Sequence, residues 1–261
     1  MRPKKHLGQH FLTAPAYAEK IADAIPCTPG ERLLEIGPGY GALSIHLKRR
    51  FPDFHLVEVD KDAVESLKQK LGEGKFTLHH GNVLEFDYAE AGLPLHVTGN
   101  LPYNIGAHII KKTLLYGSDI LSCTFMLQKE VVQRIVAPPH SKTNGFLSIF
   151  CQFFGKVKLL FSVPPGAFFP PPNVDSAVFQ LIVDRDIESK LPREQWKKFF
   201  KLVDVGFSMR RKQLAKVLSL RLGRDKAHYS TAIKQLGINE NARAEDLDVE
   251  LWLELYRGLE L

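Results

Sequence analysis

The chain has 261 residues, 44% of them hydrophobic and 25% charged, which is ordinary for a globular protein of one large domain or of a domain with a smaller companion. Its net charge is +6, and no apolar run approaches the roughly 20 residues of a membrane span. The basic start of the chain lacks the apolar core of a secretion signal. Three scattered cysteines (Cys27, Cys123 and Cys151) argue against a disulfide framework or a zinc site. We therefore expect a cytoplasmic protein that holds no metal.

The first two-thirds of the chain alternates short β-branched runs with amphipathic segments. The runs predict strands at Arg32–Ile36, His55–Val59, Phe76–His80, Leu95–Gly99 and Thr124–Leu127. The segments between them predict helices at Ala42–Phe51, Asp62–Leu71, His108–Leu115 and Glu130–Ala137. Strands that alternate with helices form βαβ units, so we expect an α/β domain with a mostly parallel, doubly wound, Rossmann-like sheet. Ligands of such sheets bind beyond the carboxyl ends of the strands.

Two further apolar segments, Phe146–Phe154 and Ser176–Val183, predict strands on either side of the Pro-rich loop Val163–Pro172. After them the pattern of apolar residues becomes helical. We therefore expect the α/β domain to cover residues 1–184 and a small all-helical domain to cover residues 185–261.

Helix signals recur along this second domain. Pro192 is expected to open a first helix and Ser208 to cap a second, basic helix. Gly237 is expected to close a third helix, and a last helix should begin at about Asp248.

The charge of the chain is unevenly distributed. From Arg185 to Lys234 there are 14 Lys and Arg against 5 Asp and Glu, whereas from Gln235 to Leu261 there are 2 against 7. A basic block of this kind is typical of a surface that binds a polyanion such as a nucleic acid, although a solvated helix face would also explain it.

The segment Leu33–Gly41 (LLEIGPGYG) predicts a strand that runs into a glycine-rich turn and then a helix. Glycine lets a ligand approach the backbone closely, and Glu58, 21 residues after Gly37, can accept hydrogen bonds from both hydroxyls of a ribose. The turn alone also fits the loose dinucleotide-binding pattern. Glu35, two residues before the first glycine, favours S-adenosylmethionine instead, because a carboxylate there can meet the methionine amino group.

A second pattern follows the strand predicted at Leu95–Gly99. Asn100–Tyr103 (NLPY) places an amide, two backbone carbonyls and an aromatic face at a strand end. This set suits the exocyclic amine of adenine, a poor nucleophile because its lone pair is delocalised into the ring. Oxygen acceptors on its two N–H bonds would localise that lone pair, and stacking on Tyr103 would hold the ring. No downstream residue offers an obvious acid for hydride transfer, which again favours methyl transfer.

With these motifs the chain resembles the ribosomal RNA adenine dimethyltransferase family nearly from end to end, and its small-subunit branch most closely. Two positions depart from the family pattern, since His10 replaces an Asn and Asn82 replaces an Asp. A charged acceptor makes the stronger hydrogen bond, so Asn82 predicts a somewhat weaker hold on the methyl donor. The resemblance rests on Leu7–Leu12 (LGQHFL), Glu35–Gly41 (EIGPGYG), Asn100–Asn104 (NLPYN), Val163–Ala177 (VPPGAFFPPPNVDSA), Phe207–Lys212 (FSMRRK), and Leu236–Ile238 with Arg243–Glu245.

The resemblance implies a reaction and a partner. S-adenosylmethionine would be the methyl donor, and the substrate would be two adjacent adenosines in the 3′-terminal hairpin loop of 16S rRNA, in the immature small ribosomal subunit. The enzyme would thus act in ribosome biogenesis. We expect a monomer whose residues 1 to about 12 fold over the donor.

The resemblance also implies site residues. The target adenine is expected to stack between Tyr103 and Phe168, and Arg210, Arg211 and Lys212 are candidates for binding RNA phosphate or for capping carbonyls. The expected donor site comprises His10, Leu12, Glu35, Gly37, Gly39, Glu58, Asn82 and Asn100. The expected catalytic residues are Asn100, Leu101, Pro102, Tyr103 and Phe168.

Three alternatives stay open. A large-subunit (23S) rRNA methyltransferase of the antibiotic-resistance type uses the same chemistry, although Leu236–Ile238 and the stretch to Glu245 favour the small-subunit branch. A DNA adenine methyltransferase has a similar turn, but the chain lacks an evident sequence-reading DNA domain. A largely non-catalytic small-subunit assembly factor would explain the basic block equally well.

Overall fold

The computed structural model describes residues 9–28, 30–51, 54–72, 74 and 76–259. The chain divides into two compact units. One comprises the chain up to Val132 together with Gly155–Arg185, and the other comprises Gln133–Phe154 together with Asp186–Leu261. The second unit therefore includes an internal segment besides the C-terminal residues expected from the sequence. None of the helices in the described ranges is both long and apolar enough to span a bilayer.

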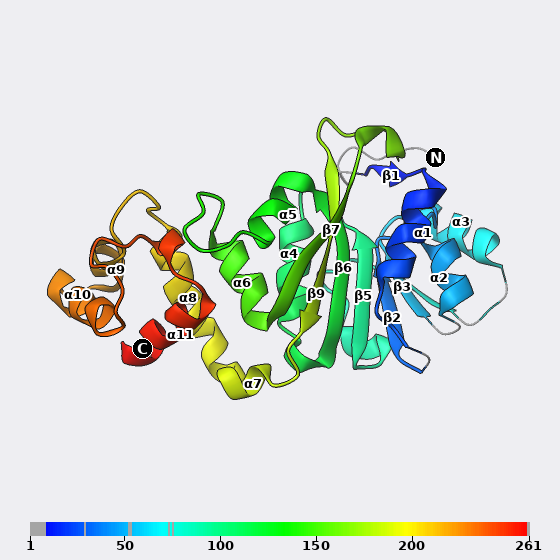
Figure 1. Cartoon of the computed structure of the whole chain (residues 1–261). Helices are drawn as coiled ribbons and strands as arrows, with labels where there is room; N and C mark the ends of the chain where they lie inside the picture. Colours follow the sequence, from blue (N-terminus) through cyan, green and yellow to red (C-terminus); the bar gives the residue numbers. More distant parts are fainter. Residues whose placement is uncertain (1–8, 29, 52–53, 73, 75, 260–261) are drawn as a thin grey trace. The chain divides into compact units, whose positions relative to one another are not determined.

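The first unit is built on a seven-stranded sheet with the strand order β4-β3-β2-β5-β6-β9-β7 (Figure 1). The strands from β4 to β6 in that order run parallel, whereas β9 is antiparallel to both β6 and β7. This mostly parallel sheet confirms the predicted α/β fold class. The strands are β2 (Arg32–Ile36), β3 (Phe54–Glu58), β4 (Phe76–His80), β5 (Leu95–Asn100), β6 (Ile120–Gln128), β7 (Gly155–Val163) and β9 (Ser176–Val183).

The order of the strands reverses between β2 and β5. The chain runs outward from β2 through β3 to β4, then returns to the other side of β2 to form β5 and β6. The carboxyl ends of β2 and β5 therefore meet at a switch point, where open α/β sheets bind their ligands. The helices of this unit are α1 (Pro15–Ala24), α2 (Ser44–Arg50), α3 (Lys61–Leu71), α4 (Gly106–Leu114) and the start of α5 (Lys129–Ile135).

A short antiparallel ribbon joins the start of the described chain to the Pro-rich loop. It pairs β1 (Phe11–Leu12) with β8 (Phe168–Phe169), so that Phe11 lies opposite Phe169 and Leu12 opposite Phe168. The Thr13 backbone N–H extends the pairing by donating to the Ala167 carbonyl at 2.8 Å.

Most of the predicted elements of the sheet are confirmed. The strands β2, β4 and β9 have the predicted bounds, and β3, β5 and β6 overlap the predicted strands. Helix α1 was not predicted. Its N-cap residue, Ala14, has no side chain that can cap a helix, so the sequence carries no capping signal there. The edge strand β7 was also missed, although exposed Lys156 and Lys158 alternate with less exposed residues, as on many edge strands.

The strand predicted at Phe146–Phe154 is wrong, because this segment forms the helix α6. Aromatic residues have a high strand propensity, but here they recur at the spacing of a helix face, at Phe146, Phe150 and Phe153. Phe150 packs against Phe200 of α8 (Trp196–Phe207) with ring centroids 4.5 Å apart. Tertiary packing of this face overrides the local propensity.

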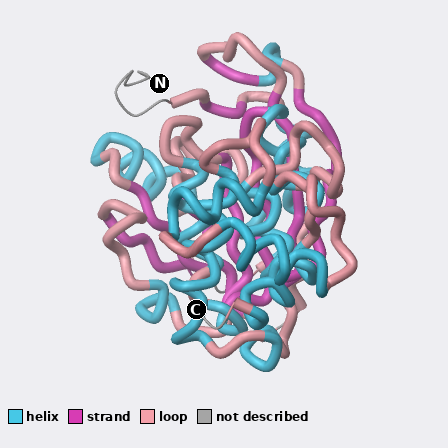
Figure 2. The backbone as a smooth tube through the Cα atoms, turned by 90° about the vertical axis from the view of Figure 1, so that its left-hand side faces the viewer, coloured by secondary structure: helices cyan, strands magenta, loops and turns pink. Residues whose placement is uncertain are grey.

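The second unit is helical and contains no strand among its described residues; helices are cyan in Figure 2. Pro192 precedes α8 by one 3₁₀ turn, and Gly237, with a φ of 70°, follows the end of α10, both as predicted. The remaining helices are α7 (Ile187–Lys190), α9 (Leu214–Leu222), α10 (Lys226–Gln235) and α11 (Val249–Gly258).

One helix cap differs from the prediction. Ser208 is the C-cap of α8, where its hydroxyl donates to the Val205 carbonyl at 2.6 Å, and it does not open a basic helix. The basic residues Arg210–Lys212 consequently lie in the turn before α9. Asp248 caps α11 as predicted, by accepting a hydrogen bond from the Leu251 backbone N–H at 2.8 Å.

Candidate functional site

A cavity of about 720 Å³ lies at the switch point of the sheet, within the size range of small-molecule and cofactor sites. It brings together the glycine-rich turn after β2, the end of β3, the end of β5 and the described part of the N-terminal arm. The predicted site residues that line it are His10, Leu12, Glu35, Gly37, Gly39, Glu58, Asn82, Asn100, Leu101, Pro102 and Tyr103.

The glycine-rich turn keeps backbone space open at the floor of the cavity. Gly37 has a φ of 61°, which favours glycine, and a Cβ built there would have no atom within 4 Å. Gly39 has a φ of 53°, and its Cβ would press against the Phe11 ring at 3.0 Å. The turn therefore allows a ligand to approach the backbone at Gly37 and the aromatic ring of the arm to approach it at Gly39.

Glu58 at the end of β3 is buried and is fixed by three backbone N–H groups. Its carboxylate accepts hydrogen bonds from Gly39, Val59 and Asp60, each at 2.9 Å. Burial raises the pKa of Glu58, and these backbone donors oppose the rise. The hydrogen bond to Gly39 ties the position of this carboxylate to the glycine-rich turn.

Glu35 is a buried acid with one hydroxyl partner. The Ser44 hydroxyl at the start of α2 donates to its carboxylate at 2.6 Å. Burial raises the pKa of Glu35 to about 8; the Ser44 hydrogen bond lowers it and the charge of Glu58 raises it. An acid in this state gains most from a cationic partner, because an ammonium group would restore the charged form.

Asn82 lies after β4 and forms a local turn. Its side-chain oxygen accepts a hydrogen bond from the Leu84 backbone N–H at 3.0 Å, and its amide nitrogen donates to Glu85 at 3.1 Å. Asn82 therefore has a structural role in this turn. Because an amide oxygen has two lone pairs, it can still accept a second hydrogen bond from a ligand in the cavity.

Asn100 ends β5 with its amide group oriented by the N-terminal arm. Its Nδ2 donates to the His10 carbonyl at 2.9 Å, which leaves the Oδ1 as the free end of the amide. The Pro102 carbonyl already accepts from the Ile105 backbone N–H at 3.2 Å. The Pro102 carbonyl keeps one lone pair, so it and the Leu101 carbonyl both stay candidates for a second acceptor of a ligand amine.

Tyr103 is held on two sides. Its hydroxyl hydrogen-bonds with the hydroxyl of the buried Ser176 at 2.6 Å, and the His10 ring stacks on it with centroids 5.3 Å apart and planes 28° apart. The Nδ1 of His10 in turn lies 2.8 Å from the Pro170 carbonyl. His10, which departs from the family pattern, thus bridges the NLPY turn and the Pro-rich loop.

Phe168 is placed differently from the prediction. It is only 4% exposed, packs in the hydrophobic core with Leu12 and lies outside the set of residues that line the cavity. The aromatic residue of this loop that reaches solvent is Phe169, which is 51% exposed. The alternation of side chains along β8 explains the difference, because neighbouring residues on a strand face opposite sides.

The three basic candidates of the second unit do not act alike. The Arg210 guanidinium donates to the Asn144 carbonyl at 2.8 Å and to Glu245 at 3.1 Å, so it crosslinks segments of the helical unit. These bonds support the carbonyl-capping alternative for Arg210, although its side chain is exposed as well. Arg211 and Lys212 are exposed.

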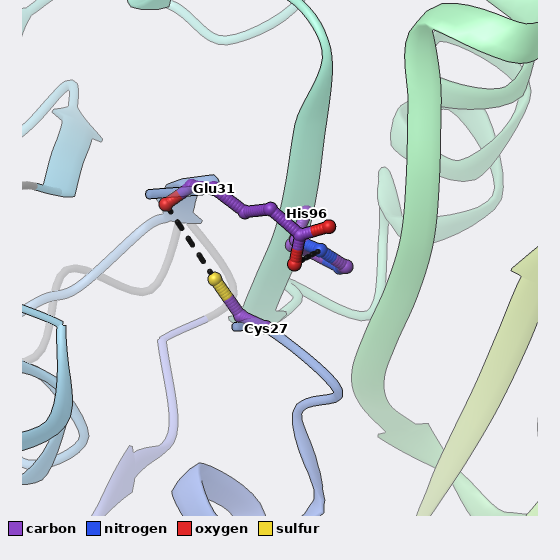
Figure 3. Close-up of side chains that lie close together, drawn as sticks. All are labelled: Cys27, Glu31 and His96. Atoms are coloured by element: carbon purple, nitrogen blue, oxygen red, sulfur yellow. Dashed lines mark hydrogen bonds and ion pairs between the residues drawn. The ribbon is translucent and has the colours of Figure 1, made fainter. Parts of the chain in front are cut away.

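A second group of polar side chains lies near the amino end of β5. Figure 3 shows Cys27, Glu31 and His96, whose potential metal-ligand atoms lie within 4.8 Å of one another. Their hydrogen bonds are complete without an ion, because Glu31 lies 3.0 Å from His96 and the other ring nitrogen of His96 lies 2.7 Å from the Ser122 hydroxyl. We therefore interpret this group as a polar network in which His96 is buried and Glu31 is exposed.

The sequence analysis missed three residues that shape the cavity. Phe11 lines it and packs against the Tyr40 ring, Ser44 holds Glu35, and Ser176 holds Tyr103. Ser176 and Phe11 lay inside motifs that had been noticed, but only the tertiary pairing of distant segments gives them partners. Ser44, nine residues after Glu35, carried no local signal.

Comparisons with known proteins agree with this geometry. The model of the family described as ribosomal RNA adenine dimethylase matches residues 1–260. The chain is 42% identical to a ribosomal RNA small subunit methyltransferase A from Xanthomonas campestris, over 97% of this chain and 94% of the relative, and 39% identical to one from Aromatoleum aromaticum, over 95% and 91%. In fold it is similar to a dimethyladenosine transferase from Plasmodium falciparum (TM-score 0.83, 21% identity, 97% and 99% covered) and to the 23S rRNA methyltransferase ErmE (TM-score 0.73, 21% identity, 96% and 100% covered).

Proposed function

Because this chain belongs to the ribosomal RNA adenine dimethylase family, we propose that it dimethylates the exocyclic amines of two adjacent adenosines in the 3′-terminal hairpin loop of 16S rRNA. The methyl donor is S-adenosylmethionine. The observation that carries the proposal is one cavity that contains both the glycine-rich turn and the NLPY turn. The substrate is the rRNA of the immature small subunit, and the enzyme acts on it as a cytoplasmic monomer without a metal.

The residues of the cavity fit the chemistry of the donor. The amino group of S-adenosylmethionine is a cation. The buried acid Glu35 bonds to the Ser44 hydroxyl and, among the described residues, to no cation. The ribose of S-adenosylmethionine has two hydroxyls that can donate hydrogen bonds. Glu58 can accept them, because backbone N–H groups hold its carboxylate in place. The open backbone at Gly37 and Gly39 and the amide of Asn82 complete the polar surface, while Leu12 and the backbone of His10 cover it from the arm. Asn100 borders both substrates.

When bound, the donor supplies an electrophilic methyl group on a sulfonium. Asn100 Oδ1 and the Leu101 or Pro102 carbonyl accept hydrogen bonds from the two N–H groups of the target amine, which localises its lone pair. The ring of Tyr103 stacks on the target base and fixes its angle of approach. The protein thus contributes positioning and fixed dipoles, and the rate gain comes from these.

Arg211 and Lys212 are proposed to contact RNA phosphate, since both are exposed in the basic part of the helical unit. Arg210 is left out of this role because its Nη2 already donates to the Asn144 carbonyl and to Glu245.

The test uses tritiated S-adenosylmethionine with undermethylated small subunits, large subunits and duplex DNA side by side, followed by nucleoside analysis. We expect dimethyladenosine in the small subunit alone. Label in the large subunit would move the assignment to the 23S type, and RNA binding without any label would favour an assembly factor.

The Asn100→Ala variant tests the catalytic assignment in the same assay. We expect at least a 100-fold loss of methylation, the scale of one transition-state acceptor, with RNA affinity preserved. Gln69→Ala is the control, because Gln69 is an exposed amide on α3 that does not line the cavity. Turnover that survives in Asn100→Ala would refute the assignment.

A further inference from the structure

An exposed aromatic side chain stands on the ribbon beside the cavity. Phe169 is 51% exposed, and Val174, two residues after the end of the Pro-rich loop, is 41% exposed. Single exposed aliphatic residues are common, but leaving half of a phenylalanine in water forfeits much of the free energy that its burial would provide. Such a ring on a rigid support is a candidate for contact with a ligand.

The pairing of β1 with β8 fixes the direction of this ring. Residues directly opposite in an antiparallel pair project to the same face. Leu12 and Phe168 therefore share the face that is buried in the core, and Phe11 and Phe169 share the other face. Phe11 and Leu12 both line the cavity, so both faces of the ribbon border it, and Phe169 projects from the face that it shares with Phe11 beside Gly39.

Hydrogen bonds hold the backbone around Phe169 in place. Thr13 donates from its backbone N–H and its hydroxyl to the Ala167 carbonyl, at 2.8 and 3.1 Å. On the other side, His10 bonds to the Pro170 carbonyl while it stacks on Tyr103. The ring is thus presented on a preorganised support, one residue from the bridge to the NLPY turn.

We infer that Phe169 is a stacking platform for the nucleotide next to the target adenosine. The inference rests on the proposed function and deepens it. Tyr103 lines the cavity and Phe169 does not, so a base that enters the cavity meets Tyr103 while its covalently linked neighbour remains at the rim. For a substrate with two adjacent adenosines, that neighbour is the companion adenine, whose large face suits an aromatic ring.

The experiment combines a protein variant with an altered RNA. Phe169→Ala and the wild-type enzyme are compared on the small-subunit hairpin with an intact or an abasic companion nucleotide, by KM for RNA and by equilibrium binding. We expect Phe169→Ala to raise KM about 10-fold, the size of one base–aromatic stack. Removing the companion base should cost the wild-type enzyme as much, and the combination should cost no more than either change alone.

Two controls separate the outcomes. Leu115→Ala removes an apolar side chain of similar exposure (48%) at the end of α4 and should leave KM unchanged. Affinity for S-adenosylmethionine should stay unchanged in Phe169→Ala. If Phe169→Ala behaves like Leu115→Ala while the wild-type enzyme methylates the hairpin, the platform is refuted and the proposed function stands. If the wild-type enzyme fails to methylate any small-subunit RNA, the proposed function itself fails.

Discussion

Two aromatic-rich regions of this protein use the same residue types for different ends. In the helical unit, Phe153, Trp196 and Phe199 are fully buried and pack edge or face against one another. At the cavity, Tyr103 is partly buried and Phe169 is half exposed. The contrast shows that aromatic rings surrounded by other side chains stabilise the fold, whereas rings that keep an accessible face are available to a ligand.

The largest effect on stability should come from a substitution in the buried aromatic cluster of the helical unit. Phe153→Ala deletes a ring that contacts Phe154, Trp196, Phe199 and Phe200. We expect it to lower the free energy of unfolding by about 3–5 kcal/mol, the cost of a large-to-small change in a packed core. Urea unfolding followed by tryptophan fluorescence would measure it. A loss below about 1 kcal/mol would show that this cluster is loosely packed.

At the cavity, substitution of an aromatic residue is expected to cost activity and not stability, and the loss of free energy should be smaller. Tyr103→Ala removes the stacking face and should reduce kcat/KM about 100-fold, which corresponds to about 2.7 kcal/mol of transition-state stabilisation. Tyr103→Phe keeps the ring and loses only the bond to Ser176, so it should cost a few-fold. The measurement is single-turnover methylation at saturating donor, with the melting temperature as control. A Tyr103→Ala protein that unfolds as readily as Phe153→Ala would erase the contrast.

The buried acid Glu35 should lower the free energy of unfolding by an amount that depends on pH. Its pKa is raised to about 8 in the folded protein, from 4.5, so the folded state binds the proton more tightly than the unfolded state does. Stability from this group is therefore complete below pH 4.5 and declines as the pH rises towards 8, by at most about 1.4 kcal/mol per pH unit.

Glu35→Gln should flatten this decline and raise stability at pH 8, while it weakens donor binding. Unfolding free energies of both proteins at pH 6, 7 and 8, without donor, provide the comparison. Parallel curves for the two proteins would mean that Glu35 keeps an ordinary pKa in the fold.

The smallest effect separates two neighbouring arginines. Arg210→Ala should lower the free energy of unfolding by about 1 kcal/mol, because it removes partly exposed hydrogen bonds to carbonyls. Arg211→Ala should leave stability unchanged and weaken RNA binding by a salt-dependent factor. Thermal melts and filter binding at two salt concentrations would test the pair. The reverse assignment would return Arg210 to the RNA surface.

The strands of the sheet and the meeting of the motifs at one of its edges could be predicted from the sequence, because both depend on local patterns. β-branched runs marked the strands, and motifs at their ends had to converge, since the carboxyl ends of parallel strands lie at one edge. Glu35, Glu58 and Asn100 could therefore be placed in one cavity before any coordinates were known.

The failures share a different physical origin. Whether Phe168 or Phe169 faces solvent depends on its register with Phe11 and Leu12, more than 150 residues away in the chain. The partners of Arg210 likewise come from Lys142, Asn144 and Glu245. Segment Phe146–Phe154 was predicted as a strand from the propensity of its aromatic residues, although their helical spacing and their packing against α8 favour a helix.

The ribbon of β1 and β8 has a consequence for the order of events in catalysis. It joins the N-terminal arm to the Pro-rich loop, and His10 adds contacts with Asn100 and with the Pro170 carbonyl. On the proposed function, a spent donor must leave after each methyl transfer, and the arm that covers it cannot lift without disturbing the RNA-side loop. We therefore expect donor exchange to be coupled to RNA release, so that the complex dissociates after the first methylation more often than it proceeds directly to the second.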